Sequence, residues 1–144
     1  MAVNYYEEGV KSKLKDKRKL SAFIQQKAFE YLPVKKVNIT YVFCDDAYLL
    51  EKNIAFLDHD TLTDIITFDL SENEKELISE IYISVERVQE NAEKFNITYQ
   101  EELHRVIFHG IMHLCGFKDK SEEDALTMRQ KEQECLTQYT KNEI

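Results

Sequence analysis

Residues 81–116 have the sequence IYISVERVQENAEKFNITYQEELHRVIFHGIMHLCG. The run begins with alternating β-branched and aromatic residues, which is typical of a strand. Ser84 is a preferred helix-capping residue, and apolar side chains recur at helical spacing from there to about Phe95. A strand that leads directly into a helix predicts a layered α/β architecture.

A second helix follows the first with almost no connection. Thr98 and Glu101 form a capping box, in which each side chain can satisfy the other residue's free backbone N–H. We expect this helix to run to about Cys115 and to stop at Gly116, because glycine readily takes the left-handed conformation that ends helices.

The flanking sequence predicts further elements of both kinds. We expect additional helices over residues 14–31, 45–56 and 121–139, and additional strands over residues 37–44 and 65–69. With the strand at 81–84, these give a small mixed sheet of about three or four strands with about five helices. No repeat, linker or low-complexity tract interrupts the chain, so residues 1–144 are expected to form a single α/β (α+β) domain.

Composition excludes several classes of protein. The chain has 144 residues, of which 43% are hydrophobic and 32% charged, as in a globular domain. No apolar run approaches the roughly 18 residues of a membrane-spanning helix, and we see no signal peptide. Three widely spaced cysteines do not suggest a disulfide framework, so a cytoplasmic location is expected.

Charge is unevenly distributed along the chain. The formal net charge is −8, yet six of the basic residues lie between Lys11 and Lys19. A basic run can bind phosphate groups, although a solvated helix start is the favoured explanation.

The segment HGIMHLCGFKD, residues 109–119, holds two of the three glycines in the chain. His109 and His113 are four residues apart, so both imidazoles can face one ion from one side of a helix. Gly110 has no Cβ, which allows another backbone or a substrate to approach closely. Asp119, beyond the turn at Gly116, is a candidate third ligand. Two imidazoles, one carboxylate and an open position form a catalytic type of zinc site, although most histidine pairs at this spacing bind nothing.

The motif His109-Gly110-x-x-His113-Leu114-x-Gly116-Phe117 closely resembles the signature of the YbeY family of bacterial endoribonucleases. Two upstream segments, 62–68 (LTDIITF) and 79–81 (SEI), are similar to other family motifs. The resemblance implies a zinc-dependent endoribonuclease that cleaves single-stranded RNA, with roles in 3′-end maturation of small-subunit rRNA and in ribosome quality control. It implies the small ribosomal subunit and an Era-like GTPase as partners, with no membrane or DNA partner.

Three residues depart from the family pattern. Asp119 stands where the family usually has a third histidine, Leu57 aligns with an arginine thought to face the substrate phosphate, and Glu80 replaces an aspartate. A carboxylate ligand lowers the net charge of a divalent site from +2 to +1, by charge counting. The ion is then a weaker Lewis acid, and the site tolerates harder ions such as Mn²⁺ better.

Several further residues are weaker candidates, each with an ordinary structural alternative. Carboxylates that can assist catalysis, or simply be caps or surface charges, are Asp64, Glu80 and Glu102. Candidate substrate contacts are Lys118, Lys120, Arg105 and His59, of which Arg105 can instead pair with Glu101 or Glu102 and His59 can be a surface residue.

Two other functions remain possible on the sequence alone. A zinc peptidase with similar ligand spacing needs a glutamate after the first histidine as general base, and Gly110 cannot take that role. A non-catalytic ribosome-assembly factor would use the metal only to pin a helix to a loop, and chelation would then unfold it.

Overall fold

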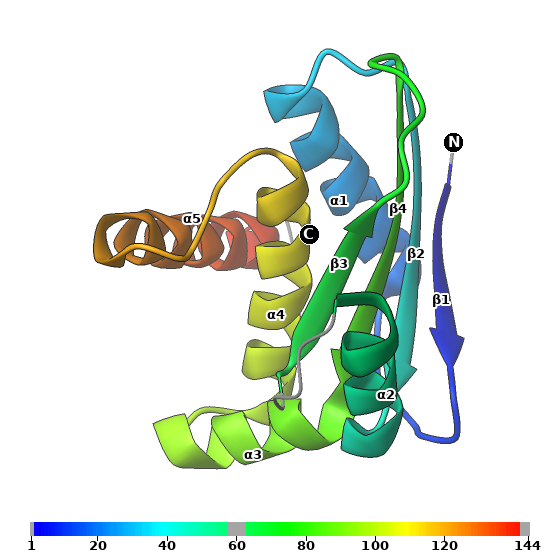
Figure 1. Ribbon diagram of the computed structural model, residues 1–144. Helices are drawn as coiled ribbons and strands as arrows, with labels where there is room; N and C mark the ends of the chain where they lie inside the picture. The colour runs from blue at the N-terminus through cyan, green and yellow to red at the C-terminus, as the bar shows by residue number, and fades with distance from the viewer. Residues whose placement is uncertain (1, 58–62, 142–144) are drawn as a thin grey trace.

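The computed structural model describes residues 2–57 and 63–141 (Figure 1). Within these ranges it contains four strands and five helices, which confirms the α/β (α+β) prediction. In chain order the elements are β1 (Ala2–Glu7), α1 (Lys17–Tyr31), β2 (Lys36–Cys44), α2 (Asp46–Leu57), β3 (Ile65–Asp69), β4 (Glu76–Ser84), α3 (Val85–Phe95), α4 (Tyr99–Leu114) and α5 (Glu122–Lys141).

The sheet is mixed and has the strand order β1-β2-β4-β3. β1 and β2 pair in parallel, as do β2 and β4, whereas β3 is antiparallel to β4. The β3 strand therefore lies at one edge, so one side of its backbone is open to a cleft.

Alternate residues of the strands face two different sets of helices. The odd-numbered side chains of β2 and β4, such as Tyr41 and Ile81, form the main core with α1 and α4. These helices lie along one side of the sheet in Figure 1, and α5 projects from α4. Cys44 and Ile66 face the other way and pack with Leu49 of α2 in a smaller cluster. No helix in the described part of the chain is both long and apolar enough to cross a membrane.

One strand and several element boundaries differ from the sequence prediction. The strand β1 was not predicted, because its six residues are short of buried apolar side chains and depend on pairing with β2. The β4 strand begins at Glu76, five residues before the predicted start, since Leu77 and Ser79 are also buried. Helix α1 begins at Lys17 instead of residue 14, because Asp16 has a φ of 53° and breaks the helix there. Helix α2 is shifted by one residue at each end.

The ends of α3 and α4 follow the predicted signals. Ser84 Oγ accepts a hydrogen bond from the backbone N–H of Arg87, and Thr98 Oγ1 accepts one from that of Glu101. Gly116, with a φ of 104°, turns the chain directly after α4.

Gly110 sets how closely α4 approaches the sheet. A Cβ at this position would lie 3.1 Å from Cδ1 of Ile65 on β3 and 3.1 Å from Cδ1 of Ile81 on β4. The groups that closely approach Gly110 are thus side chains of the sheet, Ile65 and Ile81. This packing brings the histidines of α4 beside the edge strand.

Candidate metal centre

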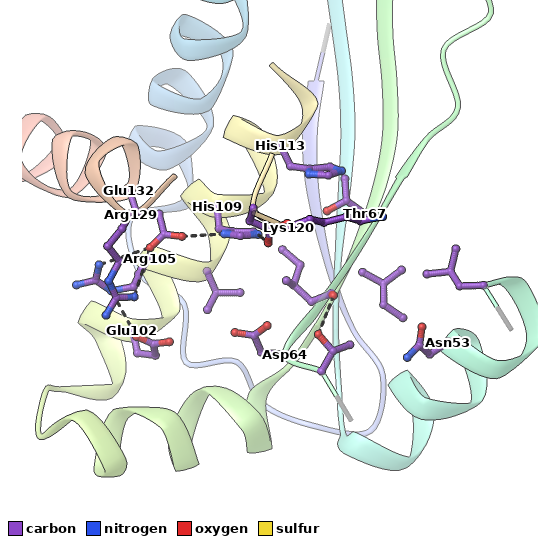
Figure 2. A pocket seen from close by; sticks show the side chains of 16 residues that line it. Asn53, Asp64, Thr67, Glu102, Arg105, His109, His113, Lys120, Arg129 and Glu132 are labelled. Carbon is purple, nitrogen blue, oxygen red and sulfur yellow. Dashed lines mark hydrogen bonds and ion pairs between the residues drawn. The ribbon is translucent and has the colours of Figure 1, made fainter. Parts of the chain in front are cut away.

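A cleft of about 440 Å³ lies between the edge strand β3 and helices α2, α4 and α5. Figure 2 shows its side chains, with those of α4 and α5 on one side and Asn53 of α2 on the other. The polar lining residues are Asn53, Thr63, Asp64, Thr67, Glu102, Arg105, His109, His113, Asp119, Lys120, Arg129 and Glu132.

His109 is the residue on which three parts of the chain converge. Its Nε2 lies 3.3 Å from Oδ2 of Asp119, which follows the turn after α4. Its Nδ1 lies 2.7 Å from Oε2 of Glu132 on α5. The structure therefore brings together His109 and Asp119, as the sequence predicted, and adds a second carboxylate on the opposite side of the ring.

His113 lies one turn further along α4 and opens onto the same cleft. Its ring lies on the Thr67 side of the cleft in Figure 2. Among residues 2–57 and 63–141, no group of three or more His, Cys, Asp or Glu side chains is close enough to hold a metal ion as the chain stands.

The chemistry of the donor atoms nonetheless fits a divalent cation. Two ligands of a tetrahedral ion, each at about 2.0–2.1 Å, are about 3.3–3.4 Å from one another. The separation of His109 Nε2 and Asp119 Oδ2 is 3.3 Å. Two acceptor atoms at that distance repel each other unless a proton or a cation lies between them, so the pair favours a positive charge.

The pKa of His109 supports the same view. Burial lowers the pKa, but the hydrogen bond to Glu132 and the negative charges of Glu132, Asp119 and Asp64 outweigh burial and raise it above the usual value. The surroundings of the ring therefore attract positive charge.

A buried charge network lies beneath His109. Arg105 is within 3.5–3.6 Å of carboxylate oxygens of Glu101, Glu102 and Glu132. These are ion pairs, because Glu102 Oε1, Arg105 Nε and Glu132 Oε1 make no hydrogen bond among the described residues. Arg105 thus pairs with carboxylates of the protein, as in the alternative to a substrate contact given above.

Burial raises the pKa of two carboxyl groups in the cleft. It raises that of Glu102 to about 7, against the opposing effect of Arg105. It also raises that of Asp64, where the positive charge of His109 acts in the opposite direction. Both groups can therefore exchange protons closer to neutral pH than an exposed carboxylate.

The other predicted site residues divide between the cleft and the rest of the surface. Lys120 lines the cleft, whereas Lys118 and Glu80 do not. The structure places Glu80 away from the cleft because side chains alternate along β4: Ile81 contacts α4, so Glu80 faces the opposite side, where it accepts a hydrogen bond from Tyr82. His59 lies outside the described residues. Leu57, aligned with the family arginine, does line the cleft.

Sequence reasoning missed Glu132 and Arg129, both on α5. No motif marks them. The available signal was helical spacing, because the buried residues of α5 are Met128, Glu132 and Cys135, which share one face. A glutamate on the buried face of a helix needs a partner, and that partner is His109.

A polar cleft beside an edge strand, with two histidines on one helix and carboxylates around them, is typical of hydrolases that use a metal ion. The comparison with known families is more specific. The sequence model of the family Endoribonuclease YbeY matches residues 3–140. The chain belongs to this family.

Curated relatives and a solved structure agree with this assignment. A Flavobacterium psychrophilum protein is 57% identical over 98 residues, covering 68% of this chain and 69% of its own. A Porphyromonas gingivalis protein is 45% identical over 135 residues (93% and 87%), and a Bacteroides fragilis protein is 43% identical over 137 residues (94% and 96%). All three are named Endoribonuclease YbeY. The solution structure of the Thermotoga maritima protein TM1509 has a TM-score of 0.60 and 29% identity, covering 98% of this chain and 93% of that one.

Proposed function

We propose that this chain is a metal-dependent endoribonuclease that matures the 3′ end of small-subunit rRNA and takes part in ribosome quality control. Membership of the YbeY family supports hydrolysis of RNA phosphodiester bonds as its activity. The observation that carries the metal dependence is the pairing of His109 and Asp119 at a ligand-to-ligand distance in a polar cleft. We further propose that residues 1–144 act as one domain in the cytoplasm.

His109, His113 and Asp119 would hold the ion. We propose one Zn²⁺ per chain, with Mn²⁺ as the alternative that a carboxylate ligand favours. When bound, such an ion polarises a phosphoryl oxygen and lowers the pKa of a water molecule. The raised pKa of His109 means that a proton competes with the ion for Nε2, so metal binding should weaken as the pH falls.

The buried carboxyl groups would handle protons. An effective general acid or base has a pKa close to the working pH. Glu102, with a pKa of about 7, meets this condition, and Asp64, directly before β3, lines the same cleft. We propose that one of these two groups exchanges a proton with the reacting phosphate or its leaving oxygen.

Two cations at the cleft would position the RNA backbone. Lys120 follows the proposed ligand Asp119, and Arg129 is on α5, with its side chain 58% exposed. Arg129 Nη1 lies 3.7 Å from Glu132, whereas Arg105 is enclosed by three carboxylates. Phosphate contacts fix the register of a strand without reading its sequence, so these side chains would orient the RNA for cleavage.

The partners proposed are those implied by the family resemblance: precursor rRNA, the small ribosomal subunit and an Era-like GTPase. Of these, RNA follows most directly from the endoribonuclease family.

The direct test is cleavage of a single-stranded RNA that contains the 3′ end of small-subunit rRNA, by protein purified without a tag. We expect cleavage by the wild type, loss of cleavage with His113→Ala and partial loss with Asp119→Ala. Cleavage that persists unchanged in His113→Ala would trace the activity to a contaminating nuclease. Full activity and full metal content in Asp119→Ala would exclude this residue as a ligand.

A further inference from the structure

We propose that Glu132 positions His109 for metal binding by accepting the Nδ1 proton, so that the Nε2 lone pair faces Asp119 and the cleft. The inference rests on the proposed metal site, and it assigns a role to a residue that no motif marks. Glu132 would be a positioning residue, since it acts through His109.

The two distances favour a proton on Nδ1 over one on Nε2. The Nδ1 atom of His109 lies 2.7 Å from Oε2 of Glu132, a short distance typical of a charge-assisted hydrogen bond. An ionised carboxylate can only accept, so Nδ1 must donate. The Nε2 atom is then the one left to face Asp119, 3.3 Å away.

Glu132 itself is held firmly. Its side chain is 8% exposed, and it lies on the buried face of α5 with Met128 and Cys135. Its second oxygen, Oε1, has Arg105 Nη1 at 3.6 Å and Arg129 Nη1 at 3.7 Å. The two guanidinium groups place positive charge beside the carboxylate, and Figure 2 shows the interaction between His109 and Glu132.

Stability alone does not explain a glutamate at this position. Burying a carboxylate costs free energy even when it is paired, and well-packed apolar residues often replace buried ion pairs without loss of stability. Met128 and Cys135 show that the same face of α5 accepts apolar side chains. A charged residue here is better explained by its hydrogen bond to His109.

The expected benefit is a ligand that is ready to bind. A histidine that donates its other N–H to a carboxylate has a fixed tautomer and ring orientation and is a more basic ligand, and mutation of such partners typically costs about 10–100-fold in metal affinity or activity. Glu132 would therefore keep the ion bound more tightly, through the orientation and the basicity of His109.

The first experiment measures the affinity of the protein for Zn²⁺, without RNA, by competition with a chelator. We expect Glu132→Ala to bind zinc about 10–100-fold more weakly than the wild type. Glu132→Gln should lose less, because its amide oxygen can still accept from Nδ1. The matched control is Glu134→Gln, on the same helix with a side chain 51% exposed and paired with Lys131, and it should bind like the wild type. Unchanged affinity in Glu132→Ala would overturn the proposal.

The second experiment reads the tautomer directly by ¹H–¹⁵N NMR of the imidazoles in metal-free protein, at a pH where His109 is neutral. We expect the Nδ1–H form in the wild type and a shift toward the Nε2–H form, which free histidine prefers, in Glu132→Ala. An Nε2–H wild type would overturn the proposal. A wild type that binds no zinc would defeat the proposed metal dependence, while the tautomer would still decide the role of Glu132.

Discussion

The two halves of α4 place histidine in opposite surroundings. In the N-terminal half, His104 Nδ1 lies 2.6 Å from the carbonyl oxygen of Gln100, and its ring stacks on Tyr139 at 5.3 Å. In the C-terminal half, His109 lies between two carboxylates. Burial lowers the pKa of His104, whereas the carboxylates, Glu132 above all, outweigh burial and raise that of His109.

The difference shows that packing partners, not the helix, determine what each histidine can do. Burial lowers the pKa of His104, and its ring already contacts a backbone carbonyl and Tyr139. A carboxylate environment makes His109 attract a proton or a metal ion. The distinction depends on α5, which places Tyr139 beside His104 and Glu132 beside His109.

The largest difference is expected between variants that remove each of the two histidines in turn. We expect His109→Ala to abolish zinc binding and to lower the rate of RNA cleavage by at least about 10³-fold, since a metal ion supplies several kcal/mol of transition-state stabilisation. His104→Phe should keep both properties, because phenylalanine preserves the ring contact with Tyr139. Zinc content and single-turnover cleavage rates measure the two. Equal losses in both variants would show that the two histidines of α4 are not functionally distinct.

A second test concerns the cations at the cleft. We expect Lys120→Ala and Arg129→Ala each to weaken binding of single-stranded RNA several-fold and to reduce the salt dependence, the slope of log K against log[salt], by about 0.7–1. Fluorescence anisotropy over a salt series measures this slope. Lys118→Ala is the matched control, because Lys118 does not line the cleft. A Lys118 variant as defective as the other two would mean that general charge, not the cleft, attracts the RNA.

The glycine that brings α4 against the sheet offers a third test. Gly110→Ala should lower the free energy of unfolding by about 1 kcal/mol, because overpacking against Ile65 and Ile81 costs about 1–3 kcal/mol and the gain in helix propensity returns about 1 kcal/mol. Urea unfolding of metal-free protein measures the change. Adding Ile65→Val removes one of the two close methyl groups and should restore part of the loss. A double variant no better than Gly110→Ala would show that this contact is not the cause.

The smallest expected effect is on how the folding stability of the metal-free protein depends on pH. The pKa of His109 is raised in the folded state, so its contribution to stability is complete below the unfolded value of about 6.5 and is lost as the pH rises through the folded pKa. The pKa of His104 is lowered, so its contribution is present above about 6.5 and is lost as the pH falls through the folded pKa.

Urea unfolding across pH 5 to 8 checks these signs. Relative to the wild type, His109→Gln should lose most stability at the acid end, and His104→Phe should gain most there. A flat difference for both variants would mean that neither ring changes its protonation on folding.

Much of the fold could be predicted because its signals are local. The caps at Ser84 and Thr98 and the turn at Gly116 act within a few residues, and all three are where the sequence placed them. The strand β1 could not be predicted in this way, because its few apolar side chains are only partly buried and its pairing partner is more than 30 residues away.

The candidate site divides in the same manner. His109 and Asp119 lie within one eleven-residue motif, so their contact follows from the helix and the turn, and His113 is one turn further along the same helix. Glu132 comes from a helix whose position depends on packing against α4, and the orientation of Glu80 depends on the register of β4. Neither of these can be read from local spacing.

The most direct test of the proposed metal site is the metal content of untagged protein, measured by elemental analysis beside His113→Ala. We expect about one zinc or similar divalent ion per chain in the wild type, lost in the variant. An absence of metal from both proteins after reconstitution would contradict it, and would favour a binding or assembly factor that keeps the fold of the YbeY family without a metal-dependent reaction.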